Sequence, residues 1–150
     1  RTRAIFVTML AGLEGGDDAD YPGSTFPDVP VGQWYAPSVA WAASEEIVSG
    51  TGSGRFEPNR NITRQEMAQI MASYLAWKGV DTTPGTDPAD YNIPDRADIA
   101  GWALDSVCFC YEKGLLSGRD TGFAPLANAS RAEACVVLCE LNDFLLKRGG

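Results

Sequence analysis

The chain has 150 residues, of which 45% are hydrophobic and 21% charged, a composition typical of a folded globular protein. Its formal net charge of −8 argues against nucleic acid as a partner, because no excess of cations could neutralise phosphates. Histidine is absent, which removes the commonest general base and metal ligand. No apolar run reaches the roughly 18–20 residues of a membrane span, and no signal peptide is visible. We expect a segment of a longer protein.

Residues 1–14 are predicted to form an apolar helix that begins directly after a capping Thr2. Residues 15–25 follow as a linker rich in Gly, Asp and Pro. The acidic run at 17–20 lacks the alternating ligands and central Gly of a calcium-binding loop. We therefore expect a solvated linker and no calcium site there.

Residues 26–77 contain two predicted helices joined by a turn-rich loop. The first should end at Gly50, since glycine adopts a left-handed helix cap without a Cβ penalty. The second begins after Thr63 and carries apolar residues at helical spacing. Residues 78–92 are predicted to form a second exposed linker.

Residues 93–147 repeat the motifs of 26–77 in the same order, at an offset of 67 or 68. Gly118 matches Gly50, and the helix at 1–14 matches the second helix of each repeat. The sequence thus holds three copies of the second helix and two copies of the segment before it. Because such repeats bury their apolar faces on their neighbours, we predict an all-α fold of tandem helical repeats with short loops or strands between helices.

The four cysteines all fall in the last repeat and align with alanines of the preceding one. Free cysteine behaves as a small hydrophobe, so we expect buried structural thiols. A disulfide is one alternative. A four-thiolate zinc site is another, although the usual CxxC pairs are missing. We expect no metal site and no cofactor. The cysteines are Cys108, Cys110, Cys135 and Cys139.

Two helix starts fit the capping box, in which a hydroxyl caps the third helical amide and a glutamate reaches back to the cap's N–H. Thr63 pairs with Glu66 in this way, and Ser130 with Glu133. Thr2 is expected to cap alone, because Ile5 stands where the glutamate would be. These five positions therefore have a structural explanation.

An arginine follows the cap in all three copies, as Arg3, Arg64 and Arg131. A cation at this end of a helix is destabilised by the helix dipole by about 0.3–1 kcal/mol. We therefore expect a partner that compensates for this cost. That partner could be a carboxylate such as Asp28 or Asp95. We favour an anionic ligand, held by the arginine and by free helix N–H groups, with the arginine at the surface.

Trp34 and Trp102 occupy matched positions just before the first helix of each repeat. Either tryptophan could fill the core. Either could equally present an indole face on which a sugar ring stacks. An arginine, a tryptophan and backbone amides around one groove would suit an acidic saccharide.

The recurring motifs closely resemble the S-layer homology (SLH) repeat. They are Phe-Pro-Asp-Val, Trp-Tyr, Ile-Val-Ser-Gly, Phe-x-Pro and Thr-Arg-x-Glu. The resemblance covers 26–77 and 93–146, plus the last helix of a preceding repeat at 1–14. It implies a pseudo-threefold, three-repeat helical bundle that anchors bacterial surface proteins to secondary cell wall polysaccharide. It also implies that pyruvylated sugar binds in grooves between repeats. Carried over, the expected ligand-binding residues are Arg3, Arg64, Arg131, Asp28, Asp95, Trp34, Trp102, Gly50 and Gly118.

The resemblance implies an extracellular, non-enzymatic anchoring module on the bacterial cell surface, with an acidic glycan as its partner. The first alternative is a protein–protein or self-assembly module that uses the same grooves, with self-association through the incomplete first repeat. The second is a glycan hydrolase that uses carboxylates such as Glu66 and Asp95.

Overall fold

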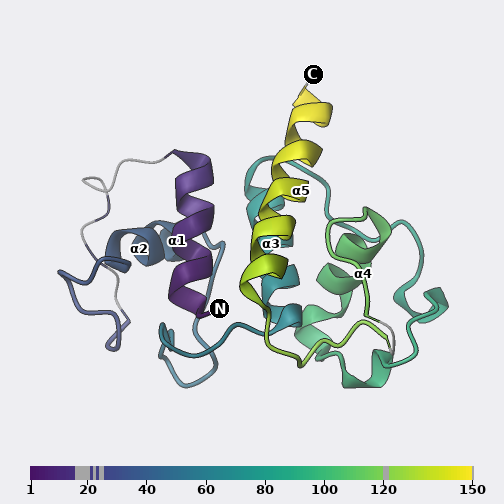
Figure 1. Ribbon diagram of the computed structural model, residues 1–150, viewed down its shortest axis with the longest axis horizontal. Helices are drawn as coiled ribbons and strands as arrows, with labels where there is room; N and C mark the ends of the chain where they lie inside the picture. The colour runs from purple at the N-terminus through teal and green to yellow at the C-terminus, as the bar shows by residue number, and fades with distance from the viewer. Residues whose placement is uncertain (16–20, 22, 24–25, 120–121, 150) are drawn as a thin grey trace. The chain divides into compact units, whose positions relative to one another are not determined.

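The computed structural model describes residues 1–150 except 16–20, 22, 24–25, 120–121 and 150. The predicted all-α fold is confirmed, since the regular elements of the described residues are helices (Figure 1). The α-helices are α1 (Arg3–Glu14), α2 (Ala36–Ser44), α3 (Arg64–Trp77), α4 (Leu104–Glu112) and α5 (Arg131–Gly149). Short 3₁₀ turns η2 (Pro88–Asp90), η3 (Arg96–Asp98) and η4 (Gly101–Ala103) lead into α4. No described helix is long and apolar enough to cross a membrane.

The chain divides into two compact units, Arg1–Ile62 and Thr63–Gly150. In the first, α1 packs against α2, and in the second, α3 packs against α4. Each unit therefore joins the second helix of one sequence repeat to the front segment of the next. The units of packing are offset from the units of sequence repetition.

The two predicted linkers differ in how much of them is described. Most of 15–25, including the acidic run at 17–20, lies outside the described residues. The linker at 78–92 is largely exposed and contains the turn η2.

Each unit buries an apolar core between its paired helices. In the first unit Phe6 and Leu10 of α1 are buried together with Val39 of α2. In the second unit Met71 of α3 and Val107 of α4 are buried. Full burial of one such side chain stabilises a fold by about 1.5–3 kcal/mol, so these helices are held mainly by packing.

The front helices end earlier than the sequence indicated. α2 ends at Ser44 and α4 at Glu112. The left-handed residue is Glu46 (φ 61°) in one repeat and Gly114 (φ 71°) in the other. The prediction that these helices end in a left-handed cap at Gly50 or Gly118 is wrong.

Gly50 and Gly118 are required for a different reason, the close approach of the loop backbone. A Cβ at Gly50 would lie 2.9 Å from the carbonyl oxygen of Arg55, and one at Gly118 would lie 3.0 Å from that of Gly122. Both loops fold back on themselves directly after these glycines. Glycine permits this approach because it has no side chain.

The exchange Glu46→Gly should raise the free energy of unfolding by about 0.5–1 kcal/mol, because glycine relieves left-handed strain. The matched control is Gly114→Ala, where no atom lies within 4 Å of the new Cβ. That variant should lose a similar amount through backbone strain alone. Urea unfolding measures both changes, and a destabilised Glu46→Gly chain would contradict this account.

Candidate functional site: two arginine–loop joints

The first helical arginines of α1 and α3 are buried side chains. Arg3 is 4% exposed and Arg64 is 2% exposed. The expectation that they lie at the surface is therefore wrong. In each case the loop of the following repeat covers the side chain. Arg131, at the start of α5, is exposed as expected.

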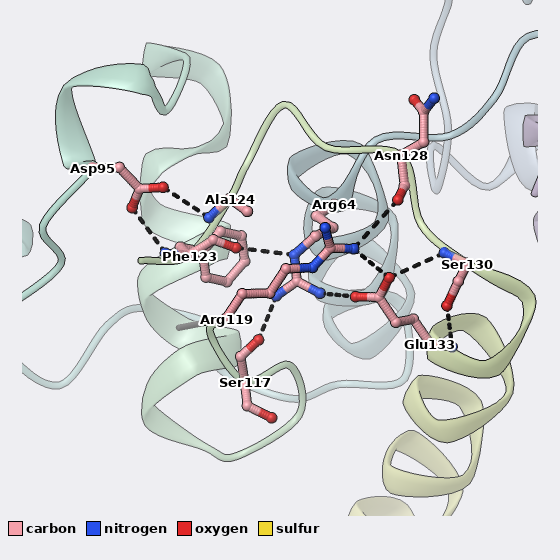
Figure 2. A network of polar contacts seen from close by, with 9 residues as sticks. All are labelled: Arg64, Asp95, Ser117, Arg119, Phe123, Ala124, Asn128, Ser130 and Glu133. Atoms are coloured by element: carbon pink, nitrogen blue, oxygen red, sulfur yellow. Dashed lines mark hydrogen bonds and ion pairs between the residues drawn. The ribbon is translucent and has the colours of Figure 1, made fainter. Parts of the chain in front are cut away.

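The second joint consists of Arg64, Ser117, Phe123 and Glu133. Arg64 Nε donates a hydrogen bond to the carbonyl oxygen of Phe123 at 2.9 Å, and Nη2 donates to the carbonyl oxygen of Ser117 (Figure 2). Nη1 forms an ion pair with Glu133. The guanidinium carbon lies 5.0 Å from the centroid of the Phe123 ring. Burial lowers the pKa of Arg64, and the charge of Glu133 acts in the opposite direction.

The first joint repeats this arrangement with Arg3, Ser49 and Phe56. Arg3 Nε donates to the carbonyl oxygen of Phe56 at 2.9 Å, and Nη2 to that of Ser49 at 3.4 Å. The guanidinium carbon lies 4.7 Å from the Phe56 ring centroid. Two independent copies of one geometry indicate that the repeat itself builds the joint.

The first backbone N–H groups of α1 and α3 donate hydrogen bonds to the same loops. The expectation that these helix N–H groups are free for an anionic ligand is wrong, because loop carbonyl oxygens accept them. The four bonds, each 2.9 Å long, run from Arg3 to Arg60, Ala4 to Pro58, Arg64 to Ala127 and Gln65 to Pro125.

A carboxylate of each repeat holds the same loop from the other side. Asp28 accepts hydrogen bonds from the backbone N–H groups of Phe56 and Glu57, at 2.9 and 2.7 Å. Asp95 accepts from Phe123 and Ala124 in the same way, both at 2.8 Å. The carboxylate that pairs with Arg64 is thus Glu133, and Asp95 binds the loop.

The residue between Phe and Pro is strained in both loops. Glu57 has φ 58° and Ala124 has φ 57°. A side chain in this region costs about 1–2 kcal/mol. The paired bonds to Asp28 and Asp95 offset that strain, because each carboxylate binds the N–H of the strained residue itself.

The three helix caps lie where the sequence placed them. Thr63 and Glu66 make both bonds of the capping box. Ser130 and Glu133 also exchange both bonds, at 3.1 and 3.0 Å. Thr2 accepts the N–H of Ile5 at 3.2 Å.

The sequence did not reveal that Glu133 makes three separate interactions. Besides capping α5, it pairs with Arg64 and with Arg119. Arg119 aligns with Thr51 of the preceding repeat, so no repeated charge marked it. Burial acts to raise the pKa of Glu133, but hydrogen bonds from Ser130 N–H and Arg119, with the charge of Arg64, lower it below 4.5.

Both matched tryptophans are exposed. Trp34 is 61% exposed and Trp102 is 55% exposed, so neither fills the core. Trp34 makes an edge-to-face ring contact with Tyr35, with centroids 5.2 Å apart. More than half of the surface of each tryptophan thus remains in contact with solvent.

The cysteines fall into two pairs. Cys108 and Cys110 are buried as predicted, whereas Cys135 and Cys139 are exposed, which makes the prediction wrong for that pair. All four thiols are free. Among the described residues no three candidate ligands gather to hold a metal ion.

Replacing Arg64 with alanine should lower the free energy of unfolding by about 2–4 kcal/mol, because it leaves buried carbonyl groups without a donor. Arg131→Ala is the matched control. Its side chain is exposed, so its effect should stay within about 0.5 kcal/mol. Urea unfolding measures both changes. Equal losses in the free energy of unfolding of the two variants would contradict the structural role of Arg64 in the joint.

Acid should destabilise both units. Burial acts to raise the pKa of Asp28, but the N–H groups of Phe56 and Glu57 lower it below 3.8. Asp28 and Glu133 have folded pKa values below their ordinary ones. Their contribution to stability is therefore fully present above the ordinary pKa values, and it is lost as the pH falls through the folded pKa values. The melting temperature should fall from about pH 5 to about pH 2. The Asp28→Asn chain should lose less over this range, and an equal loss would contradict the assignment.

Comparison with known proteins gives a family assignment. The S-layer homology domain family matches residues 25–68 and 92–135. The amylopullulanase of Thermoanaerobacterium thermosulfurigenes is 33% identical over 91% of this chain and 7% of its own length. The S-layer protein sap of Bacillus anthracis is 30% identical over 99% of this chain and 17% of its own length.

A cellulosome-anchoring protein of Acetivibrio thermocellus is 29% identical over 91% of this chain and 31% of its own length. The chain thus spans less than a third of each of these relatives. The family match covers more than half of the chain, in two segments that end inside α3 and α5. The chain belongs to the S-layer homology domain family.

Proposed function

We propose that this chain is a non-covalent anchoring module that binds an acidic, pyruvylated secondary cell wall polysaccharide. It tethers an exported bacterial protein to the cell surface and has no catalytic activity of its own. Membership of the S-layer homology family supports this role, as do relatives named as an S-layer protein and a cellulosome-anchoring protein.

The observation that carries the proposal is the matched pair of exposed indoles. Trp34 and Trp102 stand at equivalent positions of two repeats and present their surface to solvent. Indole combines a large apolar face with a polar N–H, a combination that suits stacking on a sugar ring. Recurrence in two separate packing units favours a shared binding task.

Of the remaining predicted ligand residues, all except the exposed Arg131 act on the loops of the repeats in this proposal. Arg3, Arg64, Asp28 and Asp95 hold the loops, and Gly50 and Gly118 permit their close folding. Any direct ionic contact from Arg3 or Arg64 would use a guanidinium already fixed in orientation by the loop, which reduces the entropy lost on binding.

The two carboxylates named for the hydrolase alternative both make structural hydrogen bonds. Glu66 is buried and committed to a capping box. Asp95 accepts two backbone N–H groups. A carboxylate fixed in this way is poorly available for proton transfer.

Replacing Trp34 or Trp102 with alanine should weaken binding to purified pyruvylated wall polysaccharide by roughly 2- to 10-fold at that site. The free energy of unfolding should change by no more than about 0.5 kcal/mol, since both rings are exposed. Trp77→Ala is the matched control, because Trp77 is also exposed but lies at the end of α3.

Titration calorimetry measures these affinities on the intact polymer and on polymer whose pyruvyl groups have been removed by mild acid. The parent chain should bind the first and lose most of its affinity for the second. Equal affinity for both polymers, or full affinity in the double tryptophan variant, would refute the proposal.

A further inference from the structure

The segment between α3 and α4 is held to its unit by polar contacts rather than by apolar packing. Val80 and Ile93 are buried near its two ends. Residues 81–92 are all described, and each of them is exposed or half-buried. We call residues 81–92 the strap. Segments with few buried apolar contacts and solvent-exposed hydrogen bonds open at low free energy while the rest of a fold stays closed.

Two side chains outside the strap fasten it. Glu112, the last residue of α4, accepts the N–H of Gly85 at 2.9 Å. That bond is the largest influence that lowers the pKa of Glu112. Arg96 Nη1 donates to the carbonyl oxygens of Pro88 and Ala89, at 3.0 and 2.6 Å. The turn η2, which is part of the strap, packs against α4.

Cys108 is a fully buried residue of α4 near both fastenings of the strap. It precedes Glu112 by one helical turn, so the two residues share a face of α4. Burial and the charges of Asp105 and Glu112 raise the pKa of Cys108, whereas the charge of Arg96 lowers it. The thiol therefore lies close to the two side chains that hold the strap.

Cys110, the other buried cysteine of α4, contacts α3 instead. Its Sγ lies 3.6 Å from the carbonyl oxygen of Ala68 in α3. Burial raises the pKa of Cys110 to about 12. A reagent reaches this thiol only when α3 and α4 separate. The two buried thiols thus report on two different openings of the same unit.

We propose that residues 81–92 form a strap that opens and closes as a unit over α4, and that Cys108 is a cryptic thiol exposed by this opening. The bonds from Gly85 to Glu112 and from Arg96 to the strap carbonyl groups hold the strap closed. Opening leaves α3 packed on α4. Cys108 then becomes accessible to thiol-directed modification while Cys110 stays protected.

The test measures the rate at which iodoacetamide alkylates each thiol of the whole chain. Cleavage after Phe109 separates the two buried cysteines for mass spectrometry. Cys108 should react more slowly than the exposed Cys135 and Cys139 and faster than Cys110.

The exchange Gly85→Ala should raise the alkylation rate of Cys108 roughly 2- to 10-fold. The new Cβ would overlap Oε1 of Glu112, so the carboxylate must move away from the N–H of residue 85. No charge changes in this variant. Gly101→Ala is the matched control, because no atom lies within 4 Å of its new Cβ. Its alkylation rate should equal that of the parent chain.

The exchange Arg96→Ala separates strap opening from the chemistry of the thiol. The cation favours the reactive thiolate of Cys108, so its loss alone would slow alkylation. Release of the strap has the opposite effect, and we expect alkylation to become roughly 2- to 10-fold faster. The rate at Cys110 should stay unchanged in both variants.

An unchanged rate at Cys108 in the Gly85→Ala chain, or a slower one in the Arg96→Ala chain, would overturn the proposal. Equal rates at Cys108 and Cys110 in the parent chain would also overturn it. The same holds for equal acceleration at both thiols in either variant, because the whole unit would then open rather than the strap.

Discussion

The rest of each unit depends on one interaction. The arginine that begins a helix buries its guanidinium group inside the loop of the following repeat. Arg64 donates to two loop carbonyls and pairs with Glu133, while being almost wholly removed from water. A buried cation is tolerated only when its donors are satisfied, so the loop must adopt one conformation around it. Asp95 imposes the same conformation from the opposite side through the backbone N–H groups of Phe123 and Ala124.

This arrangement changes how the repeated arginine is understood. Its position at a helix start pointed to an anion receptor. In two copies, however, it donates to carbonyl oxygens of the protein itself, and Arg64 also pairs with Glu133. The proposed function therefore assigns recognition to exposed residues, above all to the indoles of Trp34 and Trp102. In the proposed function, the joint contributes to binding mainly by fixing the loops of each unit. Substitutions in it are expected to act through stability, which separates them from substitutions of the exposed rings.

Much of this fold follows from the sequence. The repeat, the helices and the caps at Thr2, Thr63 and Ser130 came from periodicity and short-range hydrogen-bonding rules, which act within a few residues. The burial of Arg64 did not, because its partners lie more than fifty residues away. Glu46 in a left-handed conformation was missed because its side chain gave no signal for it. The matched Gly114 was a usable clue, since glycine at one copy indicates the backbone demanded at the other.

The most direct measurement of the central claim is a double-mutant cycle between Arg64→Ala and Asp95→Ala, followed by urea unfolding. The two side chains do not pair with each other but hold one loop, Arg64 through the carbonyl of Phe123 and Asp95 through its N–H. Loss of either side chain should release the loop. Each substitution should therefore lower the free energy of unfolding much less in the chain that already carries the other substitution than in the parent chain. A coupling energy of about 0.5–3 kcal/mol is expected. Additive losses, within about 0.3–0.5 kcal/mol, would show that the two residues act independently and that no shared loop clamp exists.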